Sequence, residues 1–338
     1  MLKMVNAVSV INPQKKIKIK ILGSGSGGGT PQWNCNCENC KLARKGVIPS
    51  RMQSSIAINN PAKQTKWTLV NASPDIRNQF NEYLVCKECS YLSGPIRDNR
   101  IANIVLCDSQ LDHTLGLLNI REGDPLSIFC TDTVKDQITD EFPIIKILDS
   151  YCGTIVNQIT PNEIFSPLEG VLMVPIDIES KSPPYSKYRN DSIGGSNIGL
   201  IIINKETGQK MFYAPGLGTI TPEIEEIFSK VDYVLIDGTC WTNDELINIG
   251  VSHQSACDMG HISQWSVPVS SATIVSSATG LDGSSPGLIE ILNRYPKLKK
   301  ALIHINNTNP ILNPDSFEYS ILKENNINVS YDGMEIYL

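Results

Sequence analysis

The sequence predicts an α/β fold in which two mixed β-sheets pack face to face and helices cover the outside. Three observations indicate it: short apolar runs recur along the chain, helical patterns separate them in both halves, and strands outnumber helices. An αββα sandwich is a layered arrangement that buries such elements. Loops at one edge of the sandwich would then carry the chemistry.

The elements follow in order from these patterns. Strands are expected where β-branched and aromatic residues form short runs bounded by turn residues, at 17–22, 54–58, 67–71, 101–107, 127–130, 171–176, 198–204, 210–214, 233–237, 301–305 and 329–338. Helices are expected where apolar residues recur at helical spacing, several after a capping residue, at 114–122, 221–228, 244–249, 286–294 and 315–324. The stretch 151–195 is rich in Pro, Ser and Gly and is expected to be irregular, with one strand in it.

Length and composition bound the organisation. We expect residues 1–16 to form an N-terminal arm and residues 17–338 a single domain, since mixed folds reach this size as one unit. A net charge of −6 without a long Lys or Arg cluster argues against nucleic acid as a partner. Neither a signal peptide nor an apolar run of membrane-spanning length is visible, so we expect a soluble, cytoplasmic protein with no membrane partner. A homodimer is left open.

Three closely spaced cysteines give the strongest local signal. Cys35, Cys37 and Cys40, in a loop near 34–41, can face one centre as a tetrahedral structural zinc requires. The alternative is three buried thiols without a metal. A fourth ligand must come from elsewhere, and Cys130 is the first choice because its strand should end at the same edge. Cys86 and Cys89 form a separate Cys-x-x-Cys that binds metal or has no function.

The glycine-rich stretch 23–29 precedes this loop. It lacks the Lys-Ser/Thr of a phosphate-binding loop and no helix follows it directly, so a tight loop that lets the backbone approach the site is the better interpretation.

A second signal lies between an apolar strand and a helical pattern. Asp108, Gln110, Asp112 and His113 have the spacing of the His-x-His-x-Asp-His signature of the metallo-β-lactamase superfamily. Asp112 and His113 match it, while Asp108 and Gln110 stand where its first two histidines would be. A solvated Asp-His pair is the alternative. Later residues favour a metal, because Asp237 ends one apolar strand and His304 lies in another, where a charge or an unpartnered imidazole is costly to bury.

Asp112, His113, Asp237 and His304 would form a set of two imidazoles and two carboxylates. Such a set can hold one metal ion with open positions, and it suits Fe(II) and tolerates Zn. Asp108 and Gln110 would orient the ligands or a bound oxygen species.

Over nearly its whole length the sequence resembles the coenzyme PQQ synthesis protein B family. The stretches that carry the resemblance are long and stand in the family's order: 27–40, 71–77, 108–123, 129–132, 183–186, 213–218, 237–239, 259–261, 304–310 and 331–334. The family is similar in turn to phosphodiesterases and tRNA-processing nucleases of the metallo-β-lactamase fold. In those hydrolases two metals bridge a water, and the histidines for the first of them are missing here.

The resemblance implies a role in making the quinone cofactor PQQ. The implied step is an iron- and O₂-dependent hydroxylation of the tyrosine ring in a small peptide-derived substrate, a Glu-Tyr precursor. It also places His261 where the nucleases keep an acid-base histidine, as a candidate for proton transfer or for holding a substrate carboxylate. His253 is expected to be an exposed loop residue. Two alternatives stay open: a zinc hydrolase using the same four ligands, and a carrier protein for PQQ itself.

Overall fold

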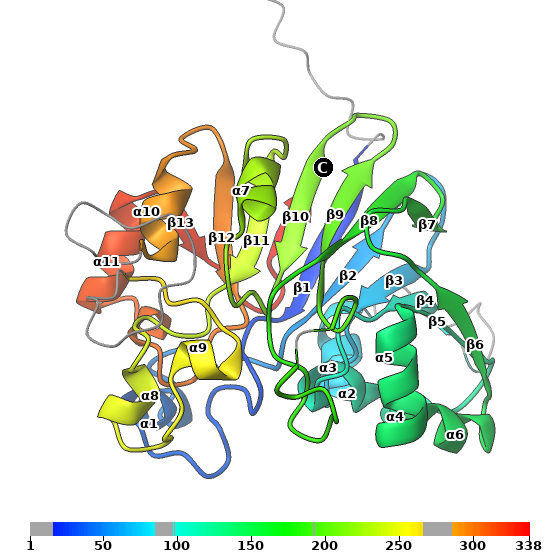
Figure 1. Cartoon of the computed structure of the whole chain (residues 1–338), viewed down its shortest axis with the longest axis horizontal. Coiled ribbons are helices and arrows are strands. Elements are labelled where there is room, and N and C mark those ends of the chain that lie inside the picture. The colour runs from blue at the N-terminus through cyan, green and yellow to red at the C-terminus, as the bar shows by residue number, and fades with distance from the viewer. Residues whose placement is uncertain (1–15, 85–96, 98, 192, 266–285) are drawn as a thin grey trace, which may run out of the picture.

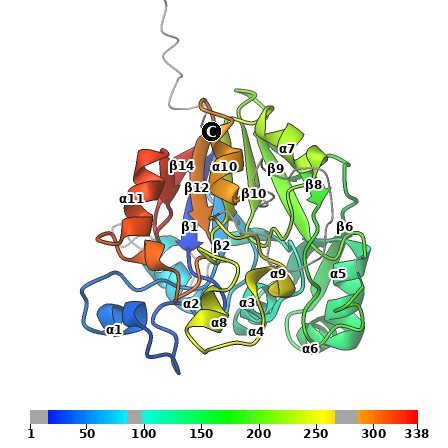
Figure 2. The same cartoon turned by 60° about the vertical axis from the view of Figure 1, so that its left-hand side comes forward.

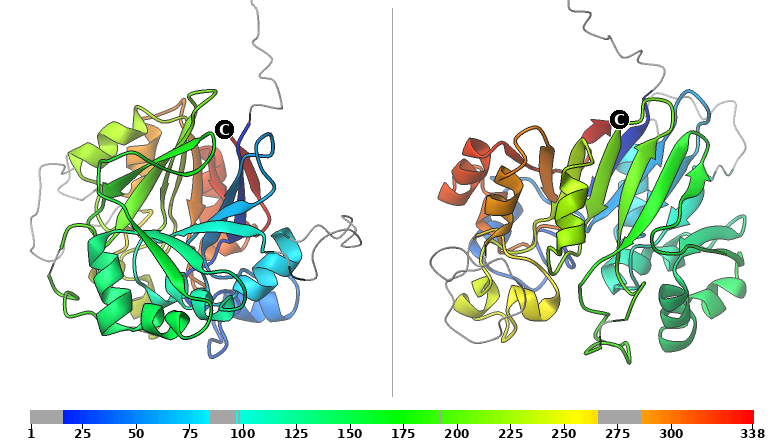
Figure 3. Two further views of the ribbon diagram at one scale, coloured as in Figure 1. Left: turned by 90° about the vertical axis from the view of Figure 1, so that its right-hand side faces the viewer. Right: turned by 45° about the horizontal axis from the view of Figure 1, so that its top comes forward.

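A computed structural model describes residues 16–84, 97, 99–191, 193–265 and 286–338. Two seven-stranded sheets pack against each other with helices on the outside (Figures 1 and 3). The predicted αββα architecture is therefore confirmed. The described part of the chain contains no helix long and apolar enough to cross a membrane. The expected N-terminal arm falls almost wholly outside the described residues.

The first sheet has the order β14-β1-β2-β3-β4-β5-β6. Its strands are β1 (Lys18–Gly23), β2 (Ser55–Asn59), β3 (Trp67–Val70), β4 (Ile101–Val105), β5 (Leu126–Cys130), β6 (Thr154–Gln158) and β14 (Glu335–Tyr337). The pairs from β14 to β3 are antiparallel and those from β3 to β6 are parallel.

The second sheet repeats this plan in the order β13-β12-β11-β10-β9-β8-β7. Its strands are β7 (Phe165–Leu168), β8 (Val171–Asp177), β9 (Ile198–Asn204), β10 (Lys210–Ala214), β11 (Tyr233–Asp237), β12 (Lys299–Ile303) and β13 (Ile327–Val329). The pairs from β7 to β10 are antiparallel and those from β10 to β13 are parallel.

Alternation along the strands explains why the apolar runs are continuous. In β11, Leu235 faces the core between the sheets, while Val234 and Ile236 face the core under the helices. Successive side chains of a strand point to opposite faces, so a strand covered on both sides must be apolar at every position. The core between the sheets takes Ile21 and Ile58 from the first sheet and Ile303 from the second.

Helices cover the outer faces and line one edge. The described helices are α1 (Glu38–Arg44), α2 (Ile76–Gln79), α3 (Leu111–Thr114), α4 (Gly116–Asn119), α5 (Asp132–Asp136), α6 (Ile144–Asp149), α7 (Pro222–Phe228), α8 (Glu245–Asn248), α9 (Ala256–Met259), α10 (Leu288–Asn293) and α11 (Phe317–Glu324), with π-helical turns at Phe80–Leu84 and Gln137–Glu141 and a 3₁₀ turn at Pro310–Leu312. Local chemistry sets their starts: the Thr221 hydroxyl accepts from the Ile224 N–H before α7, and Pro222 opens that helix.

Three expectations about the chain path differ from the structure. The stretch 151–195 holds three strands, β6, β7 and β8, rather than one. The expected single strand at 329–338 is two strands in different sheets, because the chain turns at Gly333 and crosses from β13 to β14. The expected helix at 114–122 begins earlier, at Leu111, and is divided into α3 and α4.

Candidate metal centre

Strand ends deliver the predicted ligands to one edge of the sandwich. The chain leaves β4 and enters α3, which carries Asp112 and His113, while Asp237 ends β11 and His304 directly follows β12. Strands β11 and β12 are parallel, so their carboxyl ends meet at the same edge. Helices α3, α8 and α9 lie together along this edge in two views (Figures 1 and 2).

A first group of donors contains Asp112, His113 and His304. One donor atom from each lies within 4.8 Å of the others. Asp112 Oδ2 is 3.2 Å from His304 Nε2 and 3.9 Å from His113 Nε2. The Nε2 atom of His113 is buried and has no hydrogen-bond partner among the described residues. A buried donor or acceptor without a partner is costly, so this orphaned nitrogen fits a position beside a metal ion.

Asp108 orients His113 from behind. Its carboxylate oxygens lie 2.9 and 2.8 Å from His113 Nδ1, on the side of the ring away from Asp112. A proton held on Nδ1 by this carboxylate leaves the lone pair of Nε2 free for a metal. Burial alone would lower the pKa of His113, but the carboxylates of Asp108 and Asp112 outweigh it and raise that pKa to about 9. The site therefore favours a positive charge.

The carboxylate of this group, Asp112, is held ionised. Burial would raise the pKa of Asp112, yet His113 and His304 outweigh burial and keep that pKa well below its usual range. Glycine is required next to this pair of ligands: a Cβ at Gly116 would lie 2.2 Å from the backbone oxygen of Ser73. The close approach lets α3 dock on the chain after β3, where the Ala72 N–H donates to the His113 carbonyl (2.7 Å).

A second group contains Asp237, His261 and His304. His261 Nδ1 lies 2.6 Å from Asp237 Oδ2, and the imidazole rings of His261 and His304 stack with centroids 5.2 Å apart. The other contacts of Asp237 come from the backbone: the Thr239 N–H donates to Oδ1 (2.8 Å) and the Leu217 N–H to Oδ2 (2.9 Å). Burial would lower the pKa of His261, but Asp237 outweighs it and raises that pKa.

Thr239 joins the two groups. Its hydroxyl lies 3.0 Å from His304 Nδ1 and 3.1 Å from His261 Nδ1, and it donates to the His304 carbonyl at 2.9 Å. His304 adopts a left-handed backbone conformation with φ of 61°. Such a conformation costs free energy for a residue with a side chain and persists where the surroundings impose it, as the Thr239 contacts do here.

The structure thus brings together the predicted residues in a way the sequence did not specify. Three of the four predicted ligands form one group, while Asp237 lies in the second group with His261, and the two groups share His304. Sequence reasoning missed Thr239 and the ligand-like position of His261. The Met-Gly-His turn was the available signal: α9 ends at Gly260 with φ of 93°, and this turn directs His261 back toward β11. The ligand assignment itself stays a prediction.

A cavity of about 270 Å³ opens beside both groups. Gln110 lines it, and its side-chain N–H donates to the Lys181 carbonyl (3.0 Å). The role expected for Gln110, to orient the ligands or a bound oxygen species, stays a prediction. The other lining residues come from loops at this edge and from helices α8 and α9: Ser26, Gly27, Ser180, Pro184, Arg189, Asn197, Gly216, Leu246, Gln254, Met259 and Asn306. The glycine-rich stretch therefore does approach the site, through Gly27. The size suits a small molecule. His253 is exposed and does not line this cavity.

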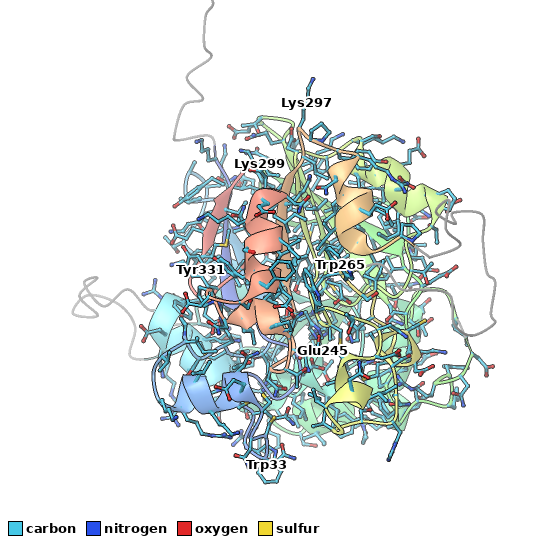
Figure 4. The ribbon with its side chains drawn as sticks, turned by 90° about the vertical axis from the view of Figure 1, so that its left-hand side faces the viewer. Trp33, Glu245, Trp265, Lys297, Lys299 and Tyr331 are labelled. Carbon is cyan, nitrogen blue, oxygen red and sulfur yellow. The ribbon has the colours of Figure 1, made fainter. Side chains whose placement is uncertain are left out.

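The cysteine loop forms a separate donor group. The sulfur atoms of Cys35, Cys37 and Cys40 lie within 4.8 Å of one another. The side-chain nitrogen of Asn307 lies 3.0, 3.5 and 3.3 Å from these three atoms. Turning that amide about its axis exchanges nitrogen for oxygen, so Asn307 can present an oxygen to a zinc ion held by the thiolates. Trp33 projects from this loop at the opposite end of the molecule from Lys297 (Figure 4).

The pKa shifts of two thiols in this loop have opposite directions: burial raises the pKa of the Cys37 thiol to about 12, whereas the pKa of the Cys35 thiol is lowered. Burial would raise the pKa of the Cys35 thiol, but hydrogen bonds from the Cys37 N–H and from Asn307 outweigh it and lower that pKa. A thiolate is the form that binds zinc. Asn39 fixes the loop to the turn after β12, since its side chain donates to the carbonyls of Asn307 (3.0 Å) and Asn309 (2.8 Å).

The choice of Cys130 as the fourth ligand is wrong. Cys130 ends β5, next to the far edge strand of the first sheet, and is buried in the core beneath α5 and α6. The cysteine loop packs instead against the turn after β12. All eight described cysteines are unpaired. Cys86 and Cys89 lie outside the described residues.

Fold and site define a class of protein. A beta-lactamase superfamily domain matches residues 66–305, and a diphosphatase of the PhnP family shares the fold with a TM-score of 0.62 at 15% identity, over 96% of this chain and 97% of that one. The protein is a member of the metallo-β-lactamase superfamily.

Closer relatives fix the family. Coenzyme PQQ synthesis protein B of Methylococcus capsulatus is 42% identical over 327 residues, and that of Acinetobacter baumannii is 43% identical over 325; each match covers 95% of this chain and 99% of the relative. The structure of Zn²⁺-bound PqqB from Methylobacterium extorquens is similar with a TM-score of 0.80 at 29% identity, over 95% of this chain and 100% of that one. The chain belongs to the coenzyme PQQ synthesis protein B family, as the resemblance of its motifs predicted.

Proposed function

We propose that the protein acts in PQQ biosynthesis as a mononuclear non-haem iron hydroxylase that uses dioxygen on the tyrosine ring of a Glu-Tyr-derived precursor. The names of its relatives support the pathway. The observation that carries the reaction type is the donor group of Asp112, His113 and His304, which shares His304 with the group of Asp237 and His261. Asp108 and Gln110 stand where the superfamily signature has the histidines of a first metal. Fe(II) held there would supply the dioxygen chemistry.

The chain's own residues have separable roles in this proposal. Asp112, His113 and His304 would hold the metal, with Asp237 as the fourth predicted ligand. Asp108 keeps the proton of His113 on Nδ1, and Thr239 fixes the ring of His304. His261 lines the cavity, and Asp237 engages its Nδ1, so its Nε2 is left to exchange a proton with a substrate hydroxyl.

A zinc hydrolase is the second candidate. The observation in its favour is the zinc in the structure of PqqB from Methylobacterium extorquens. In that case the same donors would bind zinc and a bound water would attack the substrate. A carrier of PQQ is the third candidate, and it would bind its ligand tightly without turnover.

Reconstitution distinguishes these candidates. The protein is loaded with Fe(II) or Zn(II) under argon, mixed with the dipeptide Glu-Tyr and ascorbate, exposed to air, and the product is weighed by mass spectrometry. Ascorbate supplies the two electrons that hydroxylation requires, since one oxygen atom enters the ring and the other leaves as water. We expect a gain of one oxygen atom with iron only. His304→Ala should abolish it, while His253→Ala, which removes an exposed histidine outside the site, should leave it unchanged. Equal conversion with zinc under argon would support the hydrolase and refute the oxygenase.

A further inference from the structure

An arginine without an ion-pair partner among the described residues lines the same cavity. Arg189 lines it and is half-buried, and it is the only Lys or Arg among the residues that line it. One of its amino groups donates to the Ser182 carbonyl at 2.6 Å. No carboxylate forms an ion pair with Arg189 in the described part of the chain. Its guanidinium has five N–H donors and one acceptor among the described residues, so donors and a positive charge are left for a ligand.

The loop that carries Arg189 is fixed to the metal-binding turn. The Tyr185 hydroxyl donates to the Ser109 carbonyl, between Asp108 and Gln110. The buried side chain of Gln137 bridges the two segments, since it accepts from the Ser109 hydroxyl (2.6 Å) and donates to the Ser186 hydroxyl (3.1 Å). The backbone N–H of Arg189 donates to the Ser186 carbonyl at 3.0 Å. The guanidinium therefore has a defined place relative to the metal-binding residues.

The charges of the cavity divide into two parts. At one part the carboxylates of Asp108 and Asp112 face His113 and His304, and a divalent cation would balance them. At the other part Arg189 has no acidic partner among the residues that the structure describes. A neutral ligand would leave that charge unmatched, whereas a carboxylate matches the planar fork of a guanidinium with two parallel hydrogen bonds.

We propose that Arg189 forms an anion subsite that binds a carboxylate of the substrate and so directs the rest of the molecule toward the metal group. This inference rests on the proposed function for the substrate, but the subsite follows from the unpaired arginine. Arg189 then decides specificity: acidic substrates are held in register with the metal, while their amides are not. His261 is left free for proton transfer.

Calorimetric titration of the metal-loaded protein under argon tests the subsite without turnover. The probes are the dipeptide Glu-Tyr and Gln-Tyr-amide, an analogue that has no carboxylate but keeps the N-terminal ammonium group. Wild-type protein should prefer the diacid. Arg189→Gln keeps a donor for the Ser182 carbonyl but loses the charge, and the preference should fall about 10- to 100-fold while binding of the amide changes less than about 2-fold. Arg189→Lys keeps the positive charge but not the planar guanidinium, and it should retain part of the preference for the diacid.

The matched control is Lys187→Gln. Lys187 is two residues away in the same loop, but its ammonium group lies over the Tyr188 ring and 3.8 Å from Glu141, and it does not line the cavity. It should keep the full preference. The proposal is overturned if Arg189→Gln prefers the diacid as strongly as wild type, or if wild type shows no preference or no binding. Loss of the preference in Arg189→Gln, with no oxygen incorporated by the iron-loaded wild type, would retain the subsite and reject the hydroxylase.

Discussion

At the scale of single residues, Asp108 departs from the superfamily signature but still contacts a predicted metal ligand, His113. Asp108 stands where the signature has its first histidine ligand, and its carboxylate contacts the Nδ1 atom of His113. Such outer partners orient a ligand and raise its basicity. Asp108→Asn should therefore weaken metal binding about 10- to 100-fold while the fold is retained. A competition titration with a metal chelator measures this affinity.

Asp140→Asn is the control for that substitution. Asp140 is exposed and pairs with Lys146 at 3.0 Å, away from the cavity, so its replacement should leave the metal affinity unchanged. Equal affinity of wild type and Asp108→Asn would show that Asp108 does not support His113 in metal binding.

Glu245 makes a pH-dependent contribution to stability. Its carboxylate is buried and accepts from the Trp241 N–H (2.7 Å) and from the Thr308 hydroxyl. Burial raises the pKa of Glu245 to about 7 in spite of these hydrogen bonds. The folded state then binds a proton more tightly than the unfolded state, whose glutamate has a pKa of about 4.3. The stability from this residue is complete at low pH and is lost as the pH rises to about 7.

Glu245→Gln removes this titration and tests its sign. Relative to wild type, the variant should gain stability between pH 5 and pH 8, by at most about 3 kcal/mol. Urea unfolding of both proteins at the two pH values gives the difference. A constant difference, or one that shifts the other way, would show that Glu245 is ionised in the folded protein throughout this range.

At the scale of elements, the cysteine loop and the turn after β12 form one unit. Asn39 and Cys37 both contact the backbone of Asn307, three residues after His304. Cys37→Ser should therefore lose the structural zinc, about one equivalent per chain, and also loosen the turn that holds His304. Metal analysis measures the first effect, and the melting temperature should fall as well.

Cys257→Ser is the control for this loop, because Cys257 is exposed and belongs to none of the donor groups. It should keep the full zinc content. Zinc that stays at full occupancy in Cys37→Ser would contradict a site built on these thiols. The zinc should take no part in the reaction, since neither its cysteines nor Asn307 line the cavity.

Sequence patterns predicted most strands because burial on both faces leaves a continuous apolar run, as in β11 and β12. They failed where that signal is weak. Strand β6 is an edge strand with no fully buried position, and its polar residues were taken for a loop. The break between β13 and β14 depends on which sheet each half joins, and no local pattern contains that information.

At the scale of the whole molecule, the same limit applies to the site. The sequence could predict the group of Asp112, His113 and His304 because each is an ionisable residue that follows an apolar strand. The residue that completes the cysteine group could not be predicted, because the order of strands in the sheets decides which segments meet. Strand β5 with Cys130 lies toward the opposite edge, and the turn after β12 places Asn307 beside the cysteines instead. The grouping of Asp237 with His261 likewise arises from the turn after α9.

The expectation of a single domain from residue 17 to the C-terminus can be tested through the core between the sheets. Leu235 of β11 is fully buried there, in the same cluster as Ile21 and Ile58 of the first sheet. Leu235→Ala should cost about 2–5 kcal/mol, because the cavity it leaves cannot fully close. If the chain is one cooperative unit, hydrogen exchange should then accelerate equally for the most protected amides of β2 and β11 in the metal-loaded protein.

Ile155→Ala, on the exposed side of β6, is the control and should change stability by less than about 0.5 kcal/mol. Faster exchange confined to the second sheet, with β2 unchanged, would show that the two sheets unfold separately and that the single-domain prediction is wrong.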